Sequence, residues 1–454
     1  MNTNVAYLVI ASLLVMVFLI TRNIKTVDSE YFVLNKTEKT FGLTMSFYAS
    51  GMGLWILTSP AEVAWYGLGY DIYGYAISAA TPFVLIYIFG PRISKLLPNG
   101  VTLAQFVEKK YGSVAQKIVS LVAVIYMSAF LIAEFASISF LFEAISDVSG
   151  IVIAALVATT TFLYLNKSGF KASYLTDKIQ GVGIILLLTL LFSIWFSQNS
   201  ISEITDFAVL GGLSTFETYS LKSALAVIIA ITAAEIFSTG YWQRTFSAVN
   251  EATIKKASIY SGLGVFITIL LLGIAGAVGA GKGLEIPTLS FIDQLSLNSL
   301  TVLVLISLAT LLVTSSVDTL ENAISSTISI DLIKKGSKEA NTITLLVIIL
   351  ALFAATRVNS IFTVFLVADL LATSLVFPAF YRIKKTSKDI LLVLPFIGSL
   401  ISVLVYRYLF INLEENPGGL FVPTDMYGLA DLNTFAIALV SSMIITFVAD
   451  RFTK

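Results

Sequence analysis

Residues 299–330 read SLTVLVLISLATLLVTSSVDTLENAISSTISI and contain no Lys or Arg. The stretch is longer than the ~20 apolar residues that a helix needs to cross a bilayer. In its second half, polar residues recur every three to four positions, which places them on one face of a helix. This polar face comprises Ser315, Asp318 with Thr319, Asn322, Ser325 with Ser326, and Ser329. Bonds from Ser and Thr to their own backbone explain single hydroxyls, whereas the whole face predicts a helix that lines an aqueous route.

The composition of the chain is that of a membrane protein. Its 454 residues are 57% hydrophobic and 12% charged, with a mean hydropathy of +0.90, whereas soluble domains average about 25% charged residues. This excludes a soluble enzyme, a nucleic-acid binder and a disordered regulator. The 28 basic and 28 acidic residues balance, so net charge indicates no partner. Because the chain has no Cys and no His, disulfides, thiolate metal sites, Ser-His catalysis and His proton relays are excluded.

The hydropathy pattern predicts about thirteen membrane-spanning helices in a single membrane domain covering residues 1–454. Arg22 and Lys25 follow the first span and no basic residue precedes it, which is the reverse of a signal peptide. We therefore expect a retained helix with its N-terminus outside. The predicted spans are 5–20, 41–66, 72–89, 116–146, 148–165, 172–197, 222–242, 256–281, 299–330, 342–356, 360–381, 389–411 and 432–449.

The positions of the basic residues support this topology. With the N-terminus outside, the predicted cytoplasmic loops and the C-terminus hold 24 of the 28 Lys and Arg residues, as the positive-inside rule requires. The outer side keeps only Lys222, Lys282, Arg357 and Arg407. We expect a multi-pass protein of the cell membrane with a cytoplasmic C-terminus.

Several acidic residues fall within the predicted spans, where charge is costly. These acids are Glu62, Glu134, Glu143, Glu235, Asp318, Glu321 and Asp369. Each of them taken singly is equally well explained as a protonated carboxyl that bonds a neighbouring helix, and Glu143 lies near an outer end. The whole set instead predicts bound cations, protons or water-filled pathways.

The second span contains a helix-breaking pattern. Gly51 and Gly53 lie in the middle of an apolar run, and Pro60 follows. Interrupted helices at the centre of the membrane mark ion and substrate sites in transporters, although Gly also occurs at close helix contacts. Carbonyls from an unwound segment, together with the hydroxyls of Ser315 and Ser316, would form a site of neutral oxygens. Such a site suits Na⁺, since a divalent ion normally requires several carboxylates.

The chain resembles the sodium:solute symporter family. The main match is the polar helix from Thr314 to Leu320, which continues through Ser325-Ser326-Thr327 to Asp331-Leu332-Ile333-Lys334. Four further matches follow in the family's order, and the resemblance covers about residues 1–410. They are Ala49 to Trp55, Gly100 to Phe106 with Tyr111-Gly112, Leu175-Thr176-Asp177 with Gln180, and Gln243-Arg244 with Ser247-Ala248.

The resemblance implies a LeuT-like core of two inverted five-helix repeats, at residues 41–197 and 222–381. The peripheral helices would lie at 5–20 and within 389–449, so that one helix precedes the core and two follow it. The family's sodium site would map to the carbonyls of Ala49, Met52 and Leu312 and to the hydroxyls of Ser315 and Ser316. Asp177 would lie near the inner exit route of the ion.

The predicted substrate site comprises Ser50, Gly51, Trp55, Glu235 and Asp318. Some family members carry an acid or amide at the position of Gly51, and sugar transporters carry several polar groups where this chain has Trp55, Ile56 and Leu57. Sugar is therefore a poor candidate. Span 7 should mirror span 2 but has no mid-helix Gly or Pro. Glu235 in this span suggests a substrate with an amine or amide group.

We therefore expect sodium-coupled symport of a small polar solute by alternating access, with an amino acid, urea or an amine as candidates. The alternatives are a proton-coupled symporter and an uncoupled uniporter or channel of the same fold. A sensor would need a signalling domain, and an enzyme would need a nucleophile or metal cluster. The expected partners are the solute, Na⁺ and the lipid bilayer, with no organic cofactor, nucleic acid or obligate protein partner.

Overall fold

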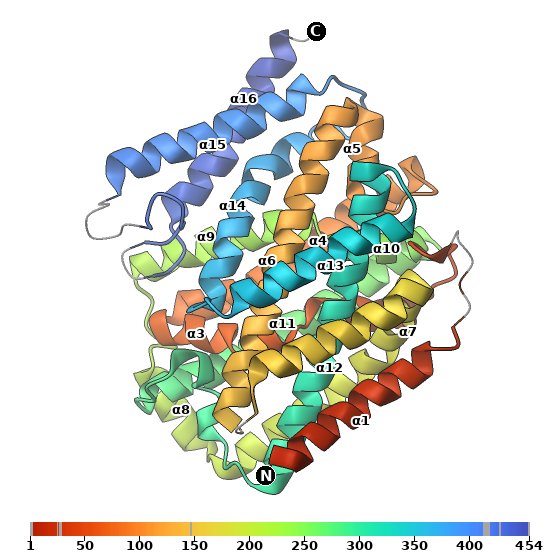
Figure 1. The fold of residues 1–454 in the computed structure, drawn as a ribbon. Helices are drawn as coiled ribbons and strands as arrows, with labels where there is room; N and C mark the ends of the chain where they lie inside the picture. The colour runs from red at the N-terminus through yellow and green to blue at the C-terminus, as the bar shows by residue number, and fades with distance from the viewer. Residues whose placement is uncertain are drawn as a thin grey trace.

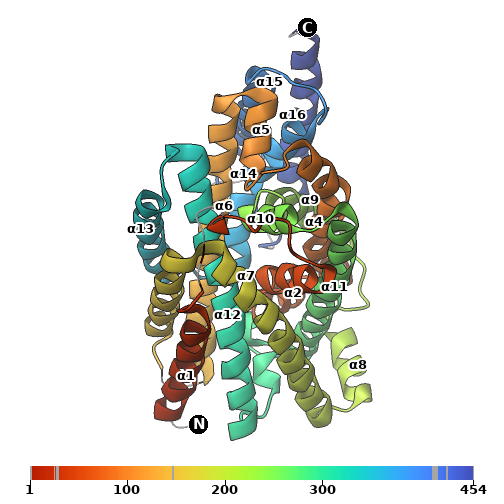
Figure 2. The ribbon, with the colours of Figure 1, turned by 90° about the vertical axis from the view of Figure 1, so that its right-hand side faces the viewer.

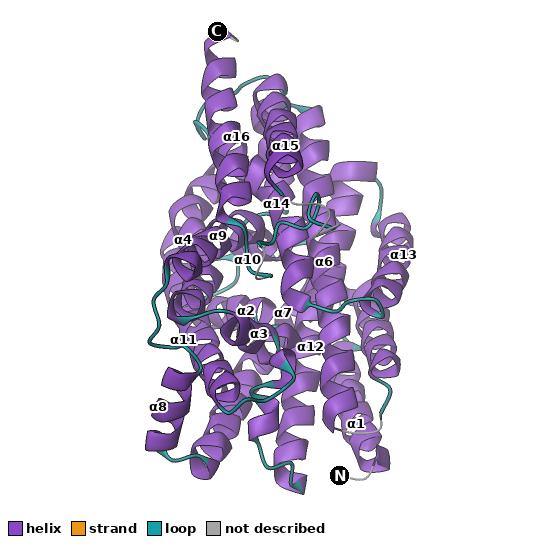
Figure 3. Cartoon of the chain, turned by 90° about the vertical axis from the view of Figure 1, so that its left-hand side faces the viewer, coloured by secondary structure: helices purple, strands orange, loops and turns teal. Residues whose placement is uncertain are grey.

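A computed structural model describes residues 3–24, 26, 30–145, 148–411, 418–425 and 428–452. In these ranges the chain is helical, with two isolated β-bridges and no strand (Figure 3). The all-helical fold class predicted from the sequence is confirmed. Of the basic residues used to assign the topology, Lys25 and Lys454 lie outside the described ranges.

Within the described residues, ten helices are long and apolar enough to cross a membrane. They are α4 (Gly69–Leu96), α6 (Ser113–Ile145), α7 (Gly150–Gln198), α9 (Thr218–Glu235), α11 (Glu251–Gly281), α12 (Ser299–Thr327) continuing into the π-helix η5 (Ile328–Ile333), α13 (Ser337–Ala355), α14 (Ile361–Phe380), α15 (Ile390–Phe410) and α16 (Leu432–Phe452). Each of these helices coincides with one or two predicted spans. The remaining predicted spans fall on α1 (Thr3–Thr21) and on a broken helix at residues 40–66.

The 49-residue α7 accounts for two predicted spans, because it bends at Gly169. Gly169 has φ +55°, a backbone conformation that side chains with a Cβ rarely adopt. A Cβ there would also lie 2.3 Å from the carbonyl oxygen of Tyr31. Glycine is therefore required for the chain to turn between the two halves of α7.

Two membrane helices are interrupted. The first consists of α2 (Thr40–Gly51), the short 3₁₀ helix η2 (Leu54–Leu57) and α3 (Ser59–Tyr66), with Met52 and Gly53 between α2 and η2. The second consists of α9 and α10 (Thr239–Ser247), separated by Ile236, Phe237 and Ser238. The Gly-rich pattern predicted the first break. The second has no Gly or Pro within it, and the Trp242 indole N–H supports it by donating to the Ile236 carbonyl at 2.7 Å.

The remaining short helices lie in connections: α5 (Leu103–Tyr111), α8 (Ile201–Leu210), η3 (Pro287–Leu289) and η4 (Ile292–Gln294). Thr102 starts α5 with a capping box, in which its hydroxyl accepts from the Gln105 N–H and the Gln105 side chain accepts from the Thr102 N–H. Ser200 and Glu203 form the same arrangement at the start of α8.

The polar helix α12 lies in the interior of the molecule. It packs against α6 and α7 and also contacts α1, α2, α10 and α13. Figure 2 shows α12 upright near the middle of the molecule, with α7 beside it. From Leu312 to Ser329 every residue of α12 and of the start of η5 is buried. The polar side chains of this face therefore contact other helices and do not face lipid.

The segment at residues 30–39 connects α1 and α2 and crosses two other elements. The Phe170 N–H at the bend of α7 donates to the Tyr31 carbonyl at 2.8 Å. At the end of α10, Glu38 pairs as a parallel bridge with Ala248, accepting from the Val249 N–H and donating to the Ser247 carbonyl. Most of these contacts use backbone atoms.

The described chain begins and ends at opposite ends of the molecule. Figure 1 shows α1 starting at one end of the long axis and α16 finishing at the other. The division into two inverted repeats remains a prediction.

Candidate functional site

The two interrupted helices meet near their breaks. A Cβ added to Gly51, at the end of α2, would lie 2.7 Å from the Tyr241 hydroxyl on α10. Gly51 therefore allows the close approach of the two half-helices. Beside this contact is a narrow cavity lined by Gly51, Met52, Trp55, Tyr75, Ala79, Phe83, Tyr126, Phe130, Ile231, Glu235, Tyr241, Val265, Phe365 and Asp369.

Two carboxylates line this cavity. Glu235 ends α9 at the helix break, and its carboxylate shares the cavity with the Tyr126 and Tyr241 side chains. Asp369 lies in the middle of α14, and its Oδ2 makes no hydrogen bond with any described residue. Their exposed fractions are 9% and 1%. Two acids in one apolar cavity need a positive charge or protons, because a bare buried carboxylate is strongly unfavourable.

The rest of the wall is mainly aromatic. The Trp55 ring lies at the centre of the group, 5.7 Å from Phe365, 6.1 Å from Phe130 and 6.3 Å from Tyr75 between centroids. The Phe83 and Tyr241 rings are 5.4 Å apart. Aromatic faces attract organic cations, so this wall and the two carboxylates favour the same kind of ligand.

Ser50 lies beside the cavity in an adjoining small pocket, which it shares with Glu235, Ser238 and Thr319. Of the predicted substrate residues, the structure thus brings Ser50, Gly51, Trp55 and Glu235 together around the two helix breaks. Asp318 is elsewhere. Its carboxylate accepts from Tyr164 at 2.5 Å, Ser173 at 2.8 Å and Thr176 at 2.9 Å, so it joins α12 to both halves of α7 and does not line the cavity.

The residues predicted to bind Na⁺ lie on elements that pack together. Ala49, Met52, Leu312, Ser315 and Ser316 are all buried, and α12 contacts both α2 and η2. Between α2 and η2, Met52 has φ −106° and ψ 86° and Gly53 is extended, so the carbonyls at the end of α2 cannot all continue the helical pattern. Hydroxyl and carbonyl oxygens are ligands that suit a hard monovalent cation. The Ala49 carbonyl accepts the Met52 N–H at 3.2 Å. Ser316 Oγ donates to the Leu312 carbonyl at 3.2 Å.

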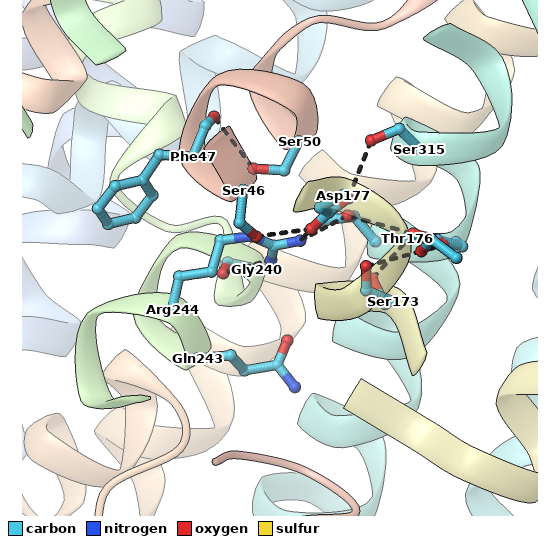
Figure 4. A network of polar contacts seen from close by, with 12 residues as sticks. Ser46, Phe47, Ser50, Ser173, Thr176, Asp177, Gly240, Gln243, Arg244 and Ser315 are labelled. Carbon is cyan, nitrogen blue, oxygen red and sulfur yellow. Dashed lines mark hydrogen bonds and ion pairs between the residues drawn. The ribbon is translucent and has the colours of Figure 1, made fainter. Parts of the chain in front are cut away.

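Asp177 is connected to this region through Ser315, whose hydroxyl donates to Asp177 Oδ1 at 2.9 Å. Its other oxygen forms a fully buried ion pair with Arg244 on α10 and accepts from Ser46 on α2 at 2.7 Å. Arg244 also donates to the Gly240 carbonyl and to Thr319. Figure 4 shows these side chains converging from α2, α7, α10 and α12.

Sequence reasoning missed several of these residues. Asp369 was one acid among seven, and nothing in its own helix indicated which other acids it would meet. Tyr75, Tyr126 and Phe365 looked like ordinary apolar membrane residues. Arg244 was assigned to a cytoplasmic loop, whereas it is completely buried in the helical bundle. The pairing of Gln243-Arg244 in the resemblance was the one signal that could have singled it out.

The chain is similar to known transporters. No protein-family model matches the chain. A spermidine transporter of Candida albicans, DUR31, is 25% identical over 441 residues, covering 92% of this chain and 83% of the relative. A probable urea active transporter of Schizosaccharomyces pombe is 24% identical over 233 residues, covering 46% of this chain and 34% of the relative.

Solved structures give the fold. A Na⁺-coupled sialic acid symporter in a substrate-bound, outward-open state aligns with a TM-score of 0.76 and 17% identity over 98% of this chain and 97% of that one. The nucleobase-cation symporter Mhp1 aligns with a TM-score of 0.58 and 13% identity, covering 93% and 95%. The chain has the LeuT-like fold predicted from its sequence.

Fold and relatives together define a multi-pass membrane transporter, and not an enzyme. Its homologues include transporters named for spermidine and for urea.

Proposed function

We propose that this protein is a sodium-coupled secondary transporter of the sodium:solute symporter type that takes up a small organic amine. The observation that carries the proposal is the cavity between the helix breaks, in which Glu235 and Asp369 face an aromatic wall. This cavity supports the assignment of the solute class, an organic amine.

The charge of the cavity separates the candidate solutes. An ammonium group neutralises a buried carboxylate and interacts with aromatic faces. Urea is neutral and leaves both carboxylates uncompensated. An amino acid brings its own carboxylate, which two acids in the same cavity would repel. A diamine or longer linear amine matches two acids best, and the name of the DUR31 relative points to the same chemistry.

Coupling to Na⁺ is supported by the donor set around Ser315 and Ser316 and by the fold shared with a Na⁺-coupled symporter. Sodium entering with the solute would drive uptake by alternating access. The proposed location is the cell membrane, with the N-terminus outside and the C-terminus in the cytoplasm.

Uptake into proteoliposomes tests both parts of the proposal. Radiolabelled putrescine, spermidine, urea and glycine are compared under an inward Na⁺ gradient, an inward H⁺ gradient and no gradient. We expect concentrative uptake of the amines with Na⁺ only. Uptake driven by H⁺ alone would mean that the coupling ion is the proton and not Na⁺. Equilibration of the solute without any gradient would indicate a uniporter or channel. Preference for urea or glycine over both amines would overturn the solute assignment.

A further inference from the structure

Glu134 on α6 is a completely buried acid that points at the first helix break. Its Oε2 accepts a hydrogen bond from the Leu54 N–H at 2.8 Å, at the start of η2. The backbone between α2 and η2 is therefore held by a carboxylate from a different helix. Glu134 does not line the substrate cavity, so the proposed amine does not account for it.

The second carboxylate oxygen of Glu134, Oε1, does not bond to the backbone at the helix break. Oε1 is buried and makes no hydrogen bond with any residue that the structure describes. A Cβ on Gly53 would lie only 1.5 Å from this oxygen, so the absence of a side chain at Gly53 creates the space in which Oε1 sits. Ser316 lies next to the same carboxylate.

Oε1 thus lies against the unwound backbone at Gly53, directly after Met52, and Ser316 lies beside the same carboxyl group. Met52 and Ser316 both belong to the predicted sodium site. The other members of that site are neutral oxygens. A carboxylate at this place would give the site a single negative charge, which balances one monovalent cation. Divalent ions normally require several carboxylates, and no cluster of three or more acids, His or Cys occurs in the described residues.

From this geometry we infer that Glu134 is an anionic ligand of the transported Na⁺, contributed by α6 to a site otherwise built from α2 and α12. The inference rests on the proposed function, since it concerns the coupling ion. In this site, the absence of a side chain at Gly53 leaves room for the carboxylate, and the hydrogen bond from the Leu54 N–H orients it. A buried charge with one free oxygen is stabilised when the cation binds.

Direct binding measurements test this inference without transport. Purified protein in detergent is titrated with ²²Na⁺, with K⁺ replacing Na⁺ at constant ionic strength. Glu134→Gln keeps the shape of the side chain and an oxygen for the Leu54 N–H, but removes the charge. We expect its Na⁺ affinity to fall at least tenfold. Glu143→Gln is the matched control, because Glu143 is an exposed acid on the same helix, and its affinity should equal that of the parent.

A second variant covers the case in which Glu134→Gln fails to fold. Glu134→Asp keeps the charge and withdraws it by one methylene, so its affinity should fall severalfold. Affinities within twofold of the parent in whichever of these variants folds would overturn the role of Glu134. If the parent itself binds no Na⁺, both this inference and sodium coupling fail. If the parent binds Na⁺ and the variants match it, only this inference fails.

Discussion

Glu235 on α9 and Asp369 on α14 line one cavity, although they are separated by more than a hundred residues in the sequence. Glu235 lies beside two tyrosine side chains, Tyr126 and Tyr241, whereas Asp369 Oδ2 has no hydrogen-bond partner among the described residues. The pair therefore combines an oriented carboxylate with one that can accept a charge from a ligand.

The first prediction concerns Glu235. Glu235→Gln keeps the volume and removes the charge, so an amine substrate should lose at least tenfold in apparent affinity, while a neutral substrate should lose less. Initial uptake rates at varied substrate concentration measure the effect. Glu217→Gln, an exposed acid at the start of the same helix, is the control. Affinity and maximal rate within twofold of the parent would exclude a substrate contact.

The second prediction concerns Asp369. If two acids recognise two ammonium groups, Asp369→Asn should weaken binding of a diamine much more than binding of a monoamine with the same carbon chain. Competition of each amine against labelled substrate measures this ratio. An equal loss for both amines would mean that Asp369 does not contact the second ammonium group.

The third prediction concerns the sodium site. The double substitution Ser315→Ala/Ser316→Ala removes two hydroxyls and keeps the helix, so the Na⁺ concentration for half-maximal uptake should rise at least tenfold with normal membrane insertion. Ser307→Ala, a half-buried serine earlier on α12, should leave it unchanged. Unaltered Na⁺ dependence in the double variant would refute the assignment.

The fourth prediction concerns the buried ion pair of Asp177 and Arg244. Removing one partner leaves an uncompensated buried charge, which costs about 3–5 kcal/mol in other proteins. Arg244→Met should therefore lower the thermal unfolding temperature strongly, and adding Asp177→Asn should recover part of the loss. The control is Lys334→Met, since the Lys334–Glu108 pair is 54% and 37% exposed and exposed pairs contribute little. Additive losses in the double variant would contradict a coupled pair.

The fifth prediction concerns Gly53. A methyl group there collides with Glu134, so Gly53→Ala should abolish uptake or prevent folding. Gly336→Ala is the matched control, because the nearest atom to its Cβ would be 3.6 Å away. Size-exclusion profiles of both variants, followed by uptake assays, measure the difference. Normal uptake by Gly53→Ala would show that the first helix break differs from the one described.

Much of the fold could be predicted from the sequence because membrane helices are specified locally. The apolar spans, the polar face of α12 and the break at Gly51–Gly53 all depend on neighbouring residues. The break between α9 and α10 could not be predicted, since Ile236 and Phe237 are apolar and the bond from Trp242 supports it from the next turn. The bend at Gly169 depends equally on Tyr31, more than a hundred residues away.

The site was predicted less completely, because convergence of side chains is a property of the packed bundle. Glu235 could be singled out by its place in the resemblance, whereas Asp369 could not be distinguished from other acids in apolar helices. Asp318 shows the opposite case. Its place on the polar face suggested a substrate contact, but hydroxyls from α7, at Tyr164, Ser173 and Thr176, take up its oxygens.

The segment at residues 30–39 has a consequence for how this protein can vary. It is bonded at Tyr31 to the bend of α7 and at Glu38 to the end of α10, largely through backbone atoms. Backbone bonds do not depend on side-chain identity, so substitutions of exposed residues between these two points should be accepted, whereas Leu34 is buried in the core. The spacing between Tyr31 and Glu38 is fixed by the distance between the two helices. Inserting or deleting one residue there would shift the backbone pairing at Tyr31 or at Glu38 out of register. The length of this segment is therefore more tightly constrained than the identity of its exposed residues.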